Sequence, residues 1–152
     1  MGMLNKSITA ENFGKLTSEG RSKVWETMVS MSGFESEFLL RVHGTESGPT
    51  EAQCDAYGAL FRNSENLRQI ATQPTIDYLY ACGIVPQEIN LNANNLWTYL
   101  SPSFIEVNDN NEYDAGAGPA ESIAISVGLQ VPWDQANLLQ IGVINGTLDN
   151  VY

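Results

Sequence analysis

The segment "NDNNEYDAG" gathers carboxylate and amide oxygens, which are the ligands that calcium prefers. An EF-hand loop beginning at Asp109 would need glycine at its sixth position and glutamate at its twelfth. Those positions hold Asp114 and Ala120, so the pattern fails, and we expect a solvated hairpin loop with no metal or other cofactor. The alternative is that an ion binds the oxygens of Asp109, Asn111, Glu112 and Asp114.

His43 is the only histidine, which excludes metal sites built on several imidazoles. A Ser-His-Asp triad would depend on it, and no G-x-S-x-G motif accompanies it. Glu106 and Glu121 flank the acidic segment and offer the two carboxylates of a glycosidase. Acidic strand ends are usually just solvated, so we expect no catalytic residue.

The three tryptophans, Trp25, Trp97 and Trp133, are expected in the core or at its rim. An exposed tryptophan among acidic residues would instead mark an interface hot spot. The second and third lie in the half of the chain that lacks cations. The predicted partner-binding residues are therefore Trp97, Glu106, Asp109, Glu112, Asp114, Trp133 and Asp134.

These residues need a scaffold, which the apolar periodicity outlines. Residues 1–22 are weakly patterned, and "KVWETMVSM" and "FLLRVHG" then predict a β-hairpin. In the second strand Phe38, Leu40 and Val42 share one face. The other face carries Leu39, Arg41 and His43.

Two antiparallel helices are predicted next, over residues 49–62 and 64–82. Ser64 is expected to cap the second, and Pro74 to kink or split it. The apolar stripes are Cys54, Tyr57, Leu60 and Phe61 in the first helix, and Leu67, Ile70, Ala71, Tyr78 and Cys82 in the second. "NLNANNLWTYLSP" predicts a short third helix that an asparagine begins and Pro102 ends.

Four strands follow, in "SFIEV", "ESIAISVGLQV", "LLQIGVI" and "TLDNVY". The second alternates large aliphatic and small residues. "PWDQAN" is read as a six-residue connection, with Trp133 over the sheet end and Asp134 bonded to backbone. Asn145-Gly146 predicts a type I′ turn, with Val143 opposite Leu148 and Ile141 opposite Asn150.

The fold class is therefore α+β, in one domain over residues 1–152. An antiparallel sheet carries two to three helices on one face. The element order is strand-strand-helix-helix-helix-strand-strand-strand-strand.

The charge is uneven along the chain. Seven basic and 18 acidic residues give −11, and no lysine or arginine follows Arg68. Nucleic-acid binding and anionic membranes are therefore not expected, because both need clustered cations. The absence of a long apolar run, of a signal-peptide pattern and of a disulfide framework predicts a reduced, cytoplasmic protein.

Three stretches resemble an uncharacterised bacterial domain family with a Q-x-x-A-Y helix, an L-W helix and a C-terminal W-D-x-E-H-G-L connection. They are "EAQCDAYGALFRNSENL", "NNLWTYLSPSFIEV" and "LQVPWDQANLLQIGVINGTLDNV", within Phe38 to Val151. Some members are immunity-protein-like, which implies stoichiometric binding. The family's Glu-His-Gly falls here on Ala136, Asn137 and Leu138, so this chain lacks the groups that could ligate a metal or move a proton there.

The leading hypothesis is a non-enzymatic acidic binding protein of a bacterial cytoplasm, which binds a basic protein partner. The first alternative is a metal-assisted or carboxylate-based hydrolase that uses the Asp109–Asp114 segment. The second is a self-associating structural module.

Overall fold

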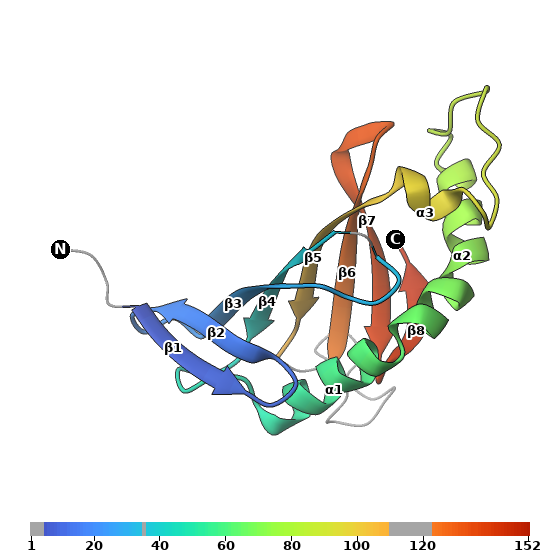
Figure 1. Cartoon of the computed structure of the whole chain (residues 1–152). Helices are drawn as coiled ribbons and strands as arrows, with labels where there is room; N and C mark the ends of the chain where they lie inside the picture. Colours follow the sequence, from blue (N-terminus) through green and yellow to red (C-terminus); the bar gives the residue numbers. More distant parts are fainter. Residues whose placement is uncertain (1–4, 35, 110–122) are drawn as a thin grey trace.

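A computed structural model describes residues 5–34, 36–109 and 123–152 (Figure 1). Four strands open the described chain: β1 (Asn5–Ala10), β2 (Gly14–Glu19), β3 (Val24–Val29) and β4 (Phe38–His43). Three helices follow: α1 (Glu51–Arg62), α2 (Ser64–Ala81) and α3 (Leu96–Tyr99). Four further strands come last: β5 (Ser101–Val107), β6 (Ala124–Val131), β7 (Asp134–Ile144) and β8 (Thr147–Val151).

The described strands form one eight-stranded sheet whose spatial order follows the chain, β1 to β8. Neighbouring strands are antiparallel except for β4 and β5, which are parallel. A parallel pair requires a crossover connection, and all three helices lie in that connection. The α+β class is confirmed, but the sheet has two more strands before the helices than the sequence predicted.

The additional strands are β1 and β2, in the segment that was expected to be weakly patterned. Asn12 and Gly14, with φ of 69° and 78°, shape the turn between them. At this turn Phe13 stacks on Tyr57 of α1 with ring centroids 4.7 Å apart, and Leu16 of β2 is fully buried. The hairpin therefore folds because it closes the core against α1 (Figure 1).

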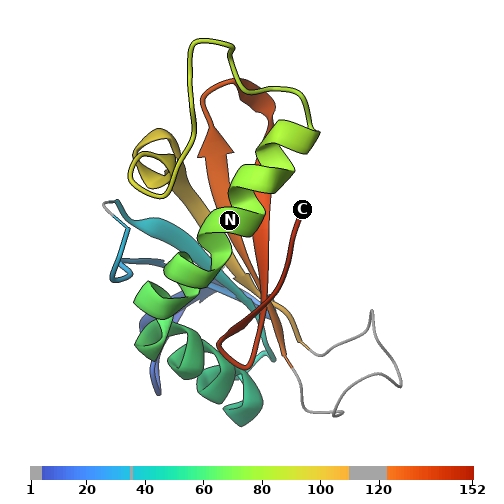
Figure 2. The same ribbon diagram turned by 90° about the vertical axis from the view of Figure 1, so that its right-hand side faces the viewer.

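Helix α1 begins at a capping box, in which Thr50 and Gln53 each accept a hydrogen bond from the other's backbone amide. Helix α2 continues from the end of α1 with a bend, where two antiparallel helices were predicted (Figures 1 and 2). The residue at the bend is Asn63, whose side-chain amide donates to the carbonyl of Gly146 at 2.7 Å. This bond ties the bend to the β7–β8 turn and sets the direction of α2.

Helix α2 is continuous through Pro74, so the predicted split is wrong. Leu67 and Ala71 before the proline and Leu79 after it are all buried, so packing on both sides outweighs the lost hydrogen bond. Asn63, not Ser64, precedes the first turn of α2, and its side chain makes no capping hydrogen bond. As described, no helix is both long and apolar enough to cross a membrane.

The predicted apolar stripes are correct only in part. Phe61 and Ile70 are 48% and 50% exposed, and Cys82 is exposed as well. Thr75, Ile76 and Leu79 are buried in α2 instead. The predicted and the observed stripe of α2 therefore share only Leu67 and Ala71.

Helices α1 and α2 run along one face of the sheet (Figures 1 and 2). We call this the covered face and the opposite side the open face. The covered face carries the buried aliphatic and aromatic side chains of the strands, including Trp25, Phe38, Leu40, Val42, Ile105, Ile125, Val127, Leu129, Ile141 and Val143.

The β7–β8 hairpin turns at Asn145 and Gly146, whose φ values of 53° and 81° fit the predicted turn type. Val143 lies opposite Leu148 as predicted. A β-bulge then shifts the register, so that Asn150 lies opposite Gly142 and not opposite Ile141.

Candidate functional site

The open face carries a row of directly opposed residues across six strands. We call it the central row; it consists of Glu26, Arg41, Glu106, Ser126, Gly142 and Asn150, on β3 to β8 in that order. Its charged members lie on β3 to β5, and its small or amide members on β6 to β8. The two halves therefore offer different surfaces.

The charges on β3 to β5 are paired. Arg41 Nε donates to Glu26 Oε2 at 2.9 Å, and both side chains are 43% exposed. Glu106 Oε1 lies 2.6 Å from Nε2 of His43, which leaves its second carboxylate oxygen for another partner. Glu106 is thus the acidic group at the border between the two halves of the row.

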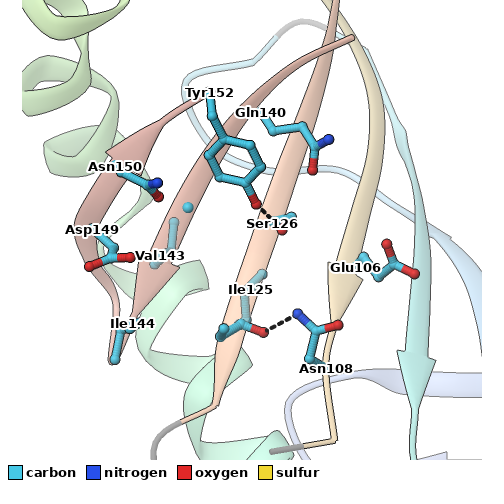
Figure 3. Close-up of a pocket in the computed structure, with 12 residues that line it drawn as sticks. Glu106, Asn108, Ile125, Ser126, Gln140, Val143, Ile144, Asp149, Asn150 and Tyr152 are labelled. Carbon is cyan, nitrogen blue, oxygen red and sulfur yellow. Dashed lines mark hydrogen bonds between the residues drawn. The ribbon is translucent and has the colours of Figure 1, made fainter. Parts of the chain in front are cut away.

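A pocket of about 590 Å³ opens over β6 to β8, beside Glu106 (Figure 3). Its floor contains Ala124, Ser126 and Gly142, which are too small to fill the space above the sheet. Its walls carry Glu106 and Asn108 on one side and Asp149, Asn150 and Tyr152 on the other. The pocket therefore exists because consecutive strands present small side chains at neighbouring positions.

Tyr152 is held over this floor. Its backbone pairs with Gln140 through hydrogen bonds of 2.7 Å and 2.9 Å. Its hydroxyl lies 2.9 Å from Oγ of Ser126, and Figure 3 shows the ring reaching across the pocket to that residue. A β-carbon added to Gly142 would lie 2.3 Å from Oδ1 of Asn150 and 3.3 Å from the Tyr152 ring, so glycine makes room for both side chains. The ring is fixed, yet the residue is 43% exposed.

Gln53 of α1 anchors the other side of the site. Its fully buried side-chain amide donates to the carbonyl oxygens of His43 at 2.7 Å and Asn108 at 2.9 Å. These residues follow or end the parallel strands β4 and β5. One helical side chain therefore positions both the partner of Glu106 and a wall of the pocket.

The residues predicted for partner binding fall into two groups. Glu106 lies opposite Ser126 near one end of β5, and Asp109 follows that end. Trp97, Trp133 and Asp134 lie near the other end, where α3 meets the β6–β7 turn (Figure 1). Glu112 and Asp114, like Glu121, lie outside the described residues. The structure does not bring the described members together in one site.

Trp97 and Trp133 are both half-buried. The indole of Trp97 donates to the hydroxyl of Thr72 at 3.0 Å and packs edge-on against Phe34. Trp133 packs against Tyr99 with ring centroids 5.1 Å apart. Both side chains pack against the core and lie at its rim, as expected from the sequence.

The connection at Trp133 is shorter than predicted. Asp134 pairs with Val131 as the first residue of β7, so only Pro132 and Trp133 lie in the turn. The Asp134 carboxylate accepts hydrogen bonds from the side-chain amide of Asn137 at 3.1 Å and 3.3 Å, where backbone was expected. Strand pairing therefore extends into a segment that its polar sequence made look like a loop.

The sequence reading missed Ser126, Gln140, Asn150 and Tyr152 as pocket residues. The signal was the second face of the strand at 124–131, where alanine, serine and glycine alternate with large residues. Small side chains on an exposed strand face can mark the floor of a binding site.

The buried titratable groups lie on the covered side. Burial raises the pKa of Tyr57 to about 12. Burial, followed by the charge of Glu11, raises the pKa of the Cys54 thiol, which keeps it protonated and unreactive. Near the α2 terminus, a hydrogen bond that the Tyr78 hydroxyl donates to the Cys82 side chain is the main cause that raises the pKa of Tyr78. Within the described ranges no cluster of three or more His, Cys, Asp or Glu side chains could hold a metal ion.

No curated protein and no solved structure matches the chain. A family model described as a domain of unknown function, DUF6985, matches residues 12–151. The match includes all the described strands but β1, and it agrees with the expectation of an uncharacterised domain family. The chain therefore belongs to the DUF6985 family.

Proposed function

We propose that this protein is a non-enzymatic binding protein that holds a basic protein partner against the open face of its sheet, as an immunity protein of a bacterial cytoplasm would. The observation that carries this proposal is the pocket beside Glu106. Two carboxylates, those of Glu106 and Asp149, line it, and no lysine or arginine does among its described lining residues.

The surface beside the pocket supports a protein partner. Met28, Leu39 and Phe104 are opposed on β3 to β5, one step along the strands from the central row. Met28 is 53% exposed, and the other two are half-buried. An apolar strip next to polar groups is the usual composition of a protein interface.

The overall charge supports a basic partner. The net charge of −11 arises mainly from the half of the chain that follows Arg68. Complementary charge speeds association and selects against partners of like charge. Within that half, Glu106 and Asp149 line the pocket, so the proposed binding region keeps Glu106 from the sequence prediction and adds Asp149.

The proposal is tested by titrating the full chain calorimetrically with a peptide of alternating arginine and serine, and with its glutamate–serine counterpart. We expect saturable binding of the basic peptide only, weakened at high salt. The double variant Glu106→Gln/Asp149→Asn should lose about thirtyfold in affinity, which is roughly the effect of one hot spot.

The matched control is Asp77→Asn/Glu88→Gln, which removes the same charge from exposed positions at and beyond α2. It should bind as the unmodified chain does. Equal losses in both double variants would show only a general charge effect, and no binding of the basic peptide would refute the proposal.

The 2.6 Å contact between His43 and Glu106 beside the pocket favours one alternative, a carboxylate-based hydrolase, because such a pair can exchange a proton. A metal-assisted version predicts that calcium or manganese raises the melting temperature.

Light scattering during size exclusion tests the third candidate, a self-associating module, for which the chain would elute as an oligomer.

A further inference from the structure

We propose that the pocket over β6 to β8 is a recognition site for a single arginine side chain, an inference that rests on the proposed function. The occupant is an arginine of a basic protein partner, inserted between Glu106 and Tyr152. Three observations support this occupant: the size of the pocket, the chemistry of its walls and the contacts that hold those walls in place.

The pocket is large enough for a complete arginine side chain. Ser126 lies opposite Gly142 on neighbouring strands, and Ala124 completes the surface. The resulting volume of about 590 Å³ is many times the ~30 Å³ of liquid that one water occupies. The stem and the planar head of an arginine can both enter.

One wall of the pocket suits the edge of a guanidinium group, and the other suits its plane. The Glu106 carboxylate leans toward β4 in Figure 3, and its oxygen that does not contact His43 can accept hydrogen bonds from the edge of the guanidinium. The Tyr152 ring can stack on the plane of the guanidinium. Lysine can use the carboxylate but lacks a plane to stack. The combination therefore favours arginine over lysine.

Both walls are held in place without the guest. His43 contacts one oxygen of Glu106 at 2.6 Å, and Ser126 contacts the Tyr152 hydroxyl at 2.9 Å. A preorganised site loses less side-chain entropy on binding. Gln140 and Asn150 add amide oxygens around the rim, which can accept the remaining guanidinium hydrogens.

The test records NMR spectra of the isotope-labelled full chain during titration with three amino acids, arginine, lysine and citrulline, each with its amino and carboxyl groups capped. Citrulline has the shape of arginine without its charge. We expect arginine to shift the amide signals of Ser126, Gly142 and Asn150 in a saturable way. Lysine should bind several-fold more weakly, and citrulline should not saturate.

Two variants test the separate roles of Glu106 and Tyr152 in binding arginine. Glu106→Gln should weaken arginine binding about tenfold, a loss that corresponds to ~1.4 kcal/mol. The matched control is Glu26→Gln, a carboxylate of the same central row that faces Arg41 and does not line the pocket. It should bind as the unmodified chain does. Tyr152→Leu should remove the preference for arginine over lysine, and the unchanged signals of distant amides verify the fold of each variant.

Equal binding of arginine and citrulline, or equal losses in the two glutamate variants, would overturn the arginine site. If the arginine–serine peptide still binds in a salt-dependent way while these probes leave the pocket signals unmoved, the proposed function stands and this inference is wrong. If that peptide also fails to bind, the proposed function has failed first.

Discussion

The two faces of strand β6 are built from different residues. On the covered face Ile125, Val127 and Leu129 are buried beneath the helices. On the open face Ser126 and Gly128 carry at most a hydroxymethyl group. The large side chains fill the space between sheet and helices. On the open face Ser126 leaves space unfilled in the pocket, whereas the ring of Phe104 covers Gly128. One face of the strand therefore stabilises the fold, and the other lines the proposed binding pocket.

The largest test of this separation is a pair of neighbouring substitutions. Leu129→Ala should lower the free energy of unfolding by about 2 to 5 kcal/mol, because it opens a cavity in a fully buried position. Gln130→Ala, on the exposed side of the same strand, should change it by less than about 0.5 kcal/mol. Denaturant unfolding measures both, and similar losses would mean that the two faces are not energetically distinct.

A second test uses the pH dependence of the covered side. The pKa of Tyr57 is raised to about 12 in the folded protein, against about 10 when unfolded. The folded state keeps the proton longer, so stability is fully present below pH ~10 and falls as pH rises toward ~12. The two-unit difference corresponds to about 2 to 3 kcal/mol.

The control for this loss of stability at alkaline pH is Tyr57→Phe, which lacks the titrating hydroxyl. Unfolding curves at increasing alkaline pH should show a steeper decline for the unmodified chain than for the variant. Parallel declines would place the tyrosine in a more hydrated setting than its burial indicates.

The third test asks why the open face has glycine at position 128. A β-carbon there would lie 2.1 Å from a ring carbon of Phe104 on β5. Gly128→Ala should therefore destabilise the chain by about 1 to 3 kcal/mol through crowding. In a Phe104→Ala background the same substitution should cost much less, which a double-mutant cycle measures. Additive losses would show that backbone conformation and not the ring requires this glycine.

Sequence alone predicted the elements whose stability is local. The hairpin of β3 and β4, the buried face of large residues in β6 and the Asn145-Gly146 turn all follow from short-range periodicity or turn chemistry. The β1–β2 hairpin was missed because its polar residues give no such pattern. It is stabilised by contacts with α1, such as the bond from the Asn12 amide to the carbonyl of Cys54 at 2.8 Å.

The direction of α2 was missed for a similar reason. It depends on Asn63, whose partner Gly146 lies 83 residues further along the chain. The pocket depends on which face of the sheet the helices cover, so its residues could not be chosen before that was known. Glu106 was predicted from charge and position, whereas Tyr152 lies in the pocket only because a β-bulge shifts the register of β8.

Among the described strands, only β4 and β5 pair in parallel, and this pairing has a consequence for how the chain folds. Strands β1 to β4 and strands β5 to β8 can each pair between neighbours in the sequence. Pairing β4 with β5 requires closure of the long segment that holds the three described helices. Loop closure of this length slows folding. We therefore expect the pairing of β4 with β5 to form last. In concentrated solution we expect two chains to form a domain-swapped dimer through this pair of strands.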